Sequence, residues 1–138
     1  MIYYLVILTK NLLVPKQIYF LAALLWAGVI AFFCLIQLNN VPLGEVSNLD
    51  KLVHVFFHFV LTVLCFLFFQ KYTNALISFK SIIISFLFSV FFGIGIEIAQ
   101  ELFTTTRHAD IFDVLANLSG AILGVAVVIL MDLKTKIR

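Results

Sequence analysis

The sequence alternates between four long apolar runs and short polar stretches. Each run approaches the roughly 20 residues that a helix needs to cross a hydrocarbon core about 30 Å thick. The runs cover residues 18–38, 52–69, 82–103 and 111–131. This pattern predicts an all-α integral membrane protein with four transmembrane helices and short loops. We assign residues 17–138 to the transmembrane domain and residues 1–16 to an N-terminal segment in the cytoplasm or at its membrane interface.

The composition supports a membrane protein and narrows its chemistry. Hydrophobic residues make up 64% of the 138 residues and charged residues 12%, whereas about 25% of the residues of soluble globular proteins are charged. The four runs leave no room for a soluble catalytic domain, and the sequence contains no nucleotide-binding or DNA-binding motif. We therefore predict membrane lipids as partners, no nucleic acid and no cofactor.

The basic residues predict the orientation of the helices. Seven of the nine Lys and Arg residues lie on the N-terminal segment, the second connection or the C-terminal end: Lys10, Lys16, Lys71, Lys80, Lys134, Lys136 and Arg138. Only Lys51 and Arg107 lie on the opposite side. Because cytoplasmic segments carry the excess of Lys and Arg in membrane proteins, we predict that both termini are cytoplasmic.

The acidic residues gather on the side opposite to most of the basic residues. Six of the seven are found there: Glu45, Asp50, Glu97, Glu101, Asp110 and Asp113. A charged side chain is costly in hydrocarbon, so such residues usually face a protein interior or a water-filled cavity. The clustering predicts a polar pocket that opens toward the outer face of the membrane.

Polar residues of the second run share one helical face. Asp50, His54 and His58 follow one another at intervals of four, and each interval advances a helix by about 6 Å at ~1.5 Å per residue. An ionisable pair inside an apolar run indicates a functional site, although a neutral histidine can also bond a neighbouring helix. We favour a functional role for His54 and His58.

The third and fourth runs each combine small residues with polar ones on a single face. The face of the third run consists of Ser81, Ser85, Ser89, Gly93, Glu97 and Glu101. The face of the fourth run consists of Asp110, Asp113, Asn117, Gly120 and Gly124. Small residues let membrane helices approach closely, so these faces are expected to turn inward. We predict helix packing at Ser85, Ser89, Gly93, Gly120 and Gly124.

Besides Lys51, Arg107 is the one fixed cation near the acidic residues. Its guanidinium can form a structural pair with Glu97 or Asp113, or bind a phosphate or carboxylate group of a ligand, and the residues leave both roles open. His54, Glu97 and Asp113 offer the mixed nitrogen and oxygen ligands that suit zinc. We do not predict a metal site from them, because no His-Glu-x-x-His motif or cysteine pair supports one.

Three groups of residues follow the order and spacing of a known family. They are Asp50-Lys51-Leu52-Val53-His54, then Glu97-Ile98-Ala99-Gln100, then Arg107 with Asp110, Asp113, Asn117 and Gly120. With these groups, the last two-thirds of the chain resembles the VanZ-like membrane proteins. His58 departs from the family pattern, in which an aromatic residue such as Tyr is common. The resemblance implies a multi-pass protein of the bacterial cytoplasmic membrane, and its founding member is associated with reduced susceptibility to the lipoglycopeptide teicoplanin.

Three functions are compatible with these residues. In the first, which we favour, the polar pocket binds or modulates a cell-envelope lipid, a cell-wall precursor or a lipoglycopeptide antibiotic. In the second, an intramembrane enzyme acts on a lipid headgroup or prenyl phosphate, with Glu97 or His54 as general base. In the third, the polar residues only join the helices. The oligomeric state stays open. The candidate cluster consists of Asp50, Lys51, His54, His58, Glu97, Gln100, Glu101, Arg107, Asp110, Asp113 and Asn117.

Overall fold

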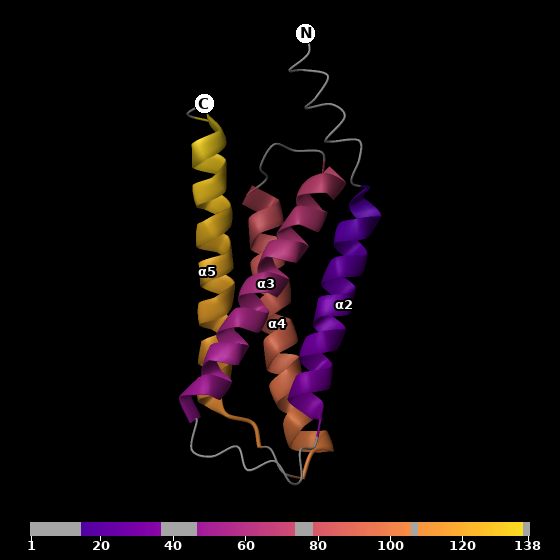
Figure 1. Cartoon of the computed structure of the whole chain (residues 1–138), viewed down its shortest axis with the longest axis vertical. Helices are drawn as coiled ribbons and strands as arrows, with labels where there is room; N and C mark the ends of the chain where they lie inside the picture. Colours follow the sequence, from indigo (N-terminus) through magenta and orange to yellow (C-terminus); the bar gives the residue numbers. More distant parts are fainter. Residues whose placement is uncertain (1–14, 37–46, 74–78, 106–107, 137–138) are drawn as a thin grey trace.

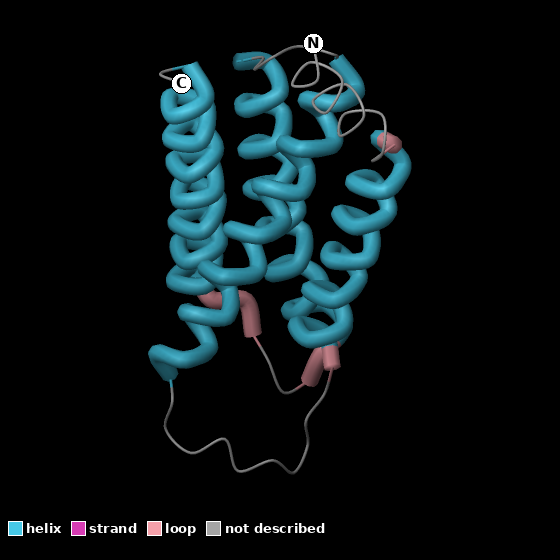
Figure 2. Tube along the Cα trace, turned by 45° about the horizontal axis from the view of Figure 1, so that its top comes forward, coloured by secondary structure: helices cyan, strands magenta, loops and turns pink. Residues whose placement is uncertain are grey.

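Four long helices account for all the regular secondary structure of the residues that the structure describes. The structure is a computed structural model, and it describes residues 15–36, 47–73, 79–105 and 108–136. The helices are α2 (Lys16–Leu35), α3 (Ser47–Thr73), α4 (Phe79–Phe103) and α5 (Ile111–Lys136) (Figures 1 and 2). Each contains a stretch long and apolar enough to cross a membrane. The predicted all-helical membrane fold is confirmed, whereas the location of the termini and the division at residue 17 stay predictions.

The helices extend beyond most of the apolar runs that predicted them. α3 begins at Ser47 and ends at Thr73, and α5 continues to Lys136. Backbone hydrogen bonding can continue where the side chains turn polar, so hydropathy marks the membrane-crossing part of a helix better than its ends. α2 is the exception: it ends at Leu35, and Ile36 takes an extended conformation with φ −67° and ψ 130°.

Successive helices run in opposite directions. α2 and α4 end where α3 and α5 begin (Figure 1). We call this the polar end, because it carries the residues Asp50, Lys51, His54, Glu97, Asp110 and Asp113. The opposite end, where α3 ends and α4 begins, carries Lys71 and Lys80 and is called the lysine end. The alternation therefore brings residues that are far apart in the sequence to the same end of the bundle.

α3 and α5 pack with their backbones in close contact. A Cβ atom on Gly120 would collide with the backbone carbonyl oxygen of Val55 and would lie 3.0 Å from the backbone nitrogen of Phe59. One turn later, a Cβ atom on Gly124 would lie 2.9 Å from the Cβ atom of Thr62. The two glycines thus have the predicted spacing and position for a small-residue contact between membrane helices.

α2 packs against α3 through larger side chains. The Trp26 ring meets the Phe57 ring edge to face, with 5.8 Å between centroids and an interplanar angle of 87°. The Trp26 indole also donates a hydrogen bond of 3.0 Å to the carbonyl oxygen of Phe57. Ile30 and Cys34 are the buried residues of α2 and join an apolar cluster with Leu61. Much of the rest of α2 is exposed, as expected of a helix that faces lipid.

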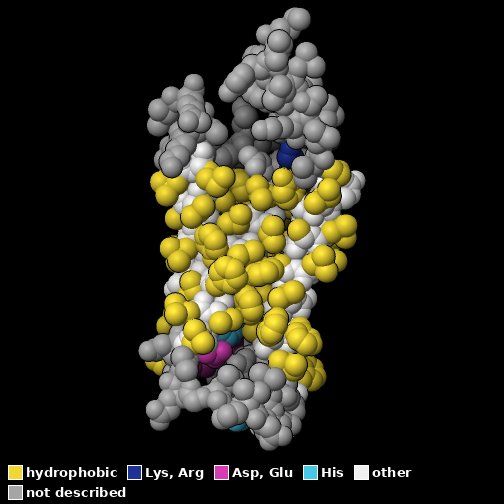
Figure 3. All heavy atoms as spheres, in the orientation of Figure 1, with side chains coloured by type: hydrophobic (Ala, Val, Ile, Leu, Met, Phe, Trp, Pro, Cys, Tyr) yellow, Lys and Arg dark blue, Asp and Glu magenta, His cyan; other side chains and the backbone are white. Residues whose placement is uncertain are grey.

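The bundle is apolar outside and partly polar inside. On the face shown in Figure 3, hydrophobic side chains cover the length of the described helices, and acidic and histidine side chains come into view near the polar end. Among the residues that the structure describes, polar and charged side chains are buried at eleven positions: His54, His58, Thr62, Ser81, Ser85, Ser89, Glu97, Gln100, Thr104, Asp113 and Asn117. This distribution suits a lipid solvent, which cannot satisfy polar groups on the outside.

Candidate functional site

Lys51 joins α3 to the beginning of α5 by two ion pairs. Its Nζ atom lies 2.9 Å from Oδ2 of Asp110 and 3.0 Å from Oδ1 of Asp113. The Asp110 carboxylate also caps α5, because its Oδ1 atom accepts a hydrogen bond of 2.9 Å from the backbone N–H of Phe112. This N–H group and then the Lys51 ammonium lower the pKa of Asp110 below its ordinary value. Asp110 therefore stays ionised at neutral pH and fixes the start of α5.

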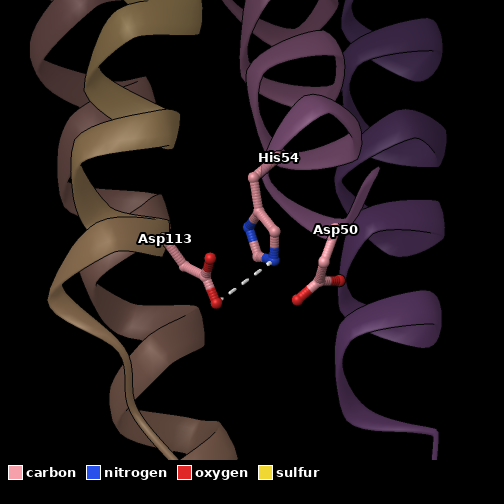
Figure 4. A group of neighbouring side chains, drawn as sticks. All are labelled: Asp50, His54 and Asp113. Atoms are coloured by element: carbon pink, nitrogen blue, oxygen red, sulfur yellow. Dashed lines mark ion pairs between the residues drawn. The ribbon is translucent and has the colours of Figure 1, made fainter. Parts of the chain in front are cut away.

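His54 lies between residues of three helices and is only 2% exposed. Its Nδ1 atom is 3.0 Å from Oδ1 of Asn117. Because an amide oxygen only accepts hydrogen bonds, this contact assigns the proton of the ring to Nδ1. The Nε2 atom points the other way, toward the carboxylates of Asp50 and Asp113, and lies 4.0 Å from Oδ2 of Asp113 (Figure 4).

Glu97 brings a buried and incompletely paired carboxylate to the site. Its side chain comes from α4, and the residue is 3% exposed. The Oε2 atom accepts a hydrogen bond of 3.4 Å from the backbone N–H of Asp110. The Oε1 atom has no hydrogen-bond partner among the described residues, and its distance of 3.9 Å to Nδ1 of His54 is too long for a hydrogen bond. Glu97 thus has a buried carboxylate oxygen, Oε1, that can accept a hydrogen bond from a further group.

Gln100 and Glu101 follow Glu97 on α4 but have different surroundings. Gln100 is buried, and its Nε2 atom donates a hydrogen bond of 2.9 Å to the carbonyl oxygen of Cys34 at the end of α2. The Glu101 side chain is 53% exposed and lies 3.4 Å from the exposed ring of His108. It also accepts a hydrogen bond of 3.0 Å from the backbone N–H of Ala109. Glu101 therefore lies at the rim of the polar end.

His58 lies one helical turn deeper than His54 and is 1% exposed. Its Nδ1 atom is 3.0 Å from the hydroxyl oxygen of Ser89, and its Nε2 atom has no hydrogen-bond partner in the described part of the chain. A Cβ atom on Gly93 would lie 2.9 Å from the His58 ring and 3.0 Å from the Asn117 amide nitrogen. The missing side chain at Gly93 therefore makes room for both polar groups in the interior.

The structure brings six of the predicted site residues together and places others apart. The six are Lys51, His54, Glu97, Asp110, Asp113 and Asn117, and Asp50 lies beside His54 (Figure 4). Arg107 and Glu45 lie outside the described residues. Sequence reasoning proposed Arg107 as the partner of the acids and missed the pairing of Lys51. The signal was available, because Lys51 precedes His54 by three residues and shares its helical face.

His54, Glu97 and Asp113, which the sequence offered only as possible metal ligands, do not converge on one point. Glu97 approaches the Nδ1 side of the ring and Asp113 the Nε2 side, so the two carboxylates do not converge on one ring nitrogen. Asp50, His54 and Asp113 do converge, with one ligand atom from each within 4.8 Å of the others. The set of residues that can hold one ion therefore contains Asp50 in place of Glu97.

The fold and the site together define a small membrane protein with four spans, whose ionisable residues are buried at one end of the bundle. A family model described as VanZ/LLP1 matches residues 1–132, and the chain belongs to this family. The match covers nearly the whole chain and therefore includes α2, which the residues behind the sequence resemblance did not reach. Comparisons with curated proteins and with solved structures found no match.

Proposed function

We propose that this protein binds the polar headgroup of a cell-envelope lipid or cell-wall precursor at the polar end of the bundle. The polar end faces the periplasm or the cell exterior, and the protein lies in the bacterial cytoplasmic membrane. A lipoglycopeptide antibiotic with similar polar groups is a second occupant of the same site. The observation that carries the proposal is the buried carboxylate of Glu97, whose Oε1 atom has no hydrogen-bond partner in the described structure.

The charges of the site favour a ligand that donates hydrogen bonds. The described residues of the cluster include five carboxylates, on Asp50, Glu97, Glu101, Asp110 and Asp113, against the ammonium of Lys51. That ammonium already binds Asp110 and Asp113. A buried carboxylate that lacks a partner costs several kcal/mol, and an amine or hydroxyl group from a ligand would offset this cost. We therefore infer a headgroup that contains amines or sugar hydroxyls.

The orientation is supported by the distribution of lysines over the helices. Lys16, Lys71 and Lys80 lie at or near the helix ends that form the lysine end, and α5 finishes there. Cytoplasmic segments carry the excess of basic residues, so the lysine end is assigned to the cytoplasm. The polar end then meets the leaflet and the aqueous phase in which cell-wall precursors and antibiotics are encountered.

An interhelical network without a ligand is the competing interpretation. It accounts for the hydrogen bonds of His54, Gln100 and Lys51, which each join two helices. It does not account for Glu97, because a glutamine or serine could join α4 to its neighbours with less desolvation. His54 also lies near the carboxylates of Glu97 and Asp113, where a histidine can act as a general base. We propose no particular reaction, because the described residues do not define a nucleophile.

The test is antibiotic susceptibility in a sensitive bacterial host that expresses the protein. The panel contains teicoplanin-like compounds and other envelope-targeting antibiotics, and the variants are His54→Ala, Glu97→Gln and Asp113→Asn at matched membrane abundance. We expect the wild type to shift susceptibility and Glu97→Gln to abolish the shift. Glu101→Gln is the matched control, because it changes the same residue type on the same helix at an exposed position.

Four results would count against the proposal. If the well-expressed wild type shifts susceptibility to no compound, the role in resistance fails. If Glu97→Gln keeps the shift, or if Glu101→Gln loses it equally, the buried site is not the site of action. If Glu97→Gln fails to accumulate in the membrane while Glu101→Gln accumulates normally, the interhelical network becomes the better interpretation.

A further inference from the structure

We propose that Asp50, His54 and Asp113 bind a divalent first-row transition metal ion between α3 and α5. Asp50 and His54 are separated by one helical turn on α3, and Asp113 comes from the first turn of α5. Figure 4 shows both carboxylates and the Nε2 atom of His54 pointing toward the same space. One ligand atom from each residue lies within 4.8 Å of the other two.

The hydrogen bond on the other side of the imidazole supports this assignment. Nδ1 of His54 donates to the amide oxygen of Asn117 at 3.0 Å, so the neutral ring has its lone pair on Nε2. Metal-binding histidines commonly donate their second ring N–H to an oxygen acceptor in this way, which fixes the tautomer and the ring orientation. Asn117 therefore holds His54 with its metal-binding nitrogen toward the two carboxylates.

The distance between His54 and Asp113 fits two ligands of one ion. Nε2 of His54 and Oδ2 of Asp113 are 4.0 Å apart, which is too long for a direct hydrogen bond. Metal–nitrogen and metal–oxygen bonds of about 2.0–2.2 Å place two ligands of a tetrahedral ion about 3.4 Å apart, so a small shift of the two side chains would let both contact one ion.

Lys51 orients one of the carboxylates without using the oxygen that faces His54. Its ammonium lies 3.0 Å from Oδ1 of Asp113, whereas Oδ2 is the atom on the His54 side. The charge of Lys51 is also balanced by Asp110 at 2.9 Å. The Lys51 ammonium thus positions the Asp113 carboxylate. The described part of the cluster still contains more carboxylates than ammonium groups.

The ligand set indicates the kind of ion. One imidazole nitrogen and two carboxylate oxygens suit Zn²⁺ and Mn²⁺, whereas Ca²⁺ and Mg²⁺ are bound mainly by oxygen atoms. Affinity for such sites rises from Mn²⁺ to Zn²⁺, so Zn²⁺ is expected to bind more tightly. This inference goes beyond the proposed function, because the ion requires only the three side chains and not a headgroup.

The experiment measures metal binding by the full chain in detergent micelles. The protein is stripped with a chelator and dialysed to equilibrium against Zn²⁺, Mn²⁺ or Mg²⁺, and the bound metal is counted by mass spectrometry. We expect saturable binding of one Zn²⁺ per chain, weaker binding of Mn²⁺, and none of Mg²⁺ at the same concentration. Asp50→Asn and His54→Ala should weaken Zn²⁺ binding at least about tenfold, by analogy with losses in other metal sites.

Two controls separate this site from adventitious binding. His108→Ala removes an exposed histidine beside Glu101 at the same end of the bundle, and it should leave the Zn²⁺ affinity unchanged. The thermal midpoint should rise with Zn²⁺ for the wild type and for His108→Ala, because an ion that binds the folded state stabilises it. It should not rise for Asp50→Asn, which changes a partly exposed residue and leaves the packed interior intact.

The proposal is overturned if the wild type shows no saturable Zn²⁺ binding. It is equally overturned if Asp50→Asn binds Zn²⁺ as tightly as the wild type, or if only His108→Ala loses binding. If His54→Ala does not accumulate, Asp50→Asn alone decides the outcome. The susceptibility test of the proposed function has its own readout, so either proposal can fail without the other.

Discussion

The contact between α3 and α5 and the contact between α2 and α3 use different means to hold two helices together. α5 approaches α3 so closely at Gly120 that a Cβ atom would collide with the Val55 carbonyl oxygen, and hydrogen bonds and ion pairs at the polar end reinforce the contact. α2 approaches α3 with Trp26, whose indole donates a hydrogen bond of 3.0 Å to the carbonyl oxygen of Phe57.

The difference follows from the solvent. In lipid, apolar side chains gain little by leaving the hydrocarbon for another apolar surface, so close packing and polar contacts drive helix association. The contact between α5 and α3 has both close packing and polar contacts, and α5 contributes Asp113 and Asn117 to the cluster. α2 has mostly bulky apolar side chains, and its Gly28 has no atom within 4 Å of an added Cβ. We infer that α3 and α5 form the rigid part that positions the site, and that α2 covers one side of it.

Gly120→Ala should break the stronger of the two contacts. The added methyl group meets backbone atoms of α3, which cannot move aside independently, so we expect a loss of about 3 kcal/mol in the free energy of unfolding. Gly28→Ala on α2 is the matched control, and it should stabilise by up to about 1 kcal/mol through helix propensity. Equilibrium unfolding in mixed detergent micelles measures both. Equal effects of the two substitutions would refute the comparison.

Gly93→Ala tests whether the deeper polar residues share the tight packing of the α3–α5 contact. The added methyl group would lie 2.9 Å from the His58 ring and 3.0 Å from the Asn117 amide. These side chains can shift by a few tenths of an ångström, so we expect a smaller loss of about 1 kcal/mol. Gly95→Ala is the control on the same helix, because nothing lies within 4 Å of its added Cβ. The same unfolding measurement applies, and a neutral Gly93→Ala would show that this region is loosely packed.

Trp26→Phe tests the weaker contact. The substitution keeps an aromatic ring beside Phe57 and removes the hydrogen bond to its carbonyl oxygen. Interhelical hydrogen bonds in membranes contribute about 0.6 kcal/mol on average, and we expect a loss of this order. Phe32→Leu changes an exposed position of α2 and should have no measurable effect. A loss larger than that of Gly120→Ala would mean that α2 is the main determinant of stability.

Asp110→Asn should have the smallest effect, and this effect should be lost in acid. The Phe112 N–H group and Lys51 lower the pKa of Asp110 below its ordinary value of 3.8. A lowered pKa in the folded state stabilises the protein above the unfolded pKa, and this contribution is lost as the pH falls through the folded pKa. The difference in thermal midpoint between the wild type and Asp110→Asn should therefore shrink below about pH 4. Glu97, Asp113 and His54 also lie nearby. If the difference in thermal midpoint between the wild type and Asp110→Asn does not change with pH, any acid response of the protein comes from these groups and not from Asp110.

The sequence predicted the helices well because each apolar run approached the length that a membrane requires. It also predicted which residues would lie at the polar end, since alternating helices place the starts of α3 and α5 beside the ends of α2 and α4. The sequence did not predict the hydrogen bond from Gln100 to the backbone carbonyl oxygen of Cys34. Every residue has a backbone carbonyl group, so no sequence pattern marks this acceptor. The sequence could not distinguish Glu97 from Glu101, because both lie on the same helical face. In the structure Glu97 is buried inside the bundle, whereas Glu101 lies at its end and is exposed.

α5 is the last of the four helices to be synthesised, and this order affects how the bundle assembles. α3 and α4 leave the ribosome before the helix that supplies Asn117 and Asp113. His54 is therefore synthesised before its partner Asn117, and Glu97 and Lys51 are synthesised before their partner Asp110. We expect α3 and α4 to stay within the insertion machinery until α5 arrives. We expect a chain truncated before residue 110 to expose these polar side chains to lipid and to be degraded faster than the full chain.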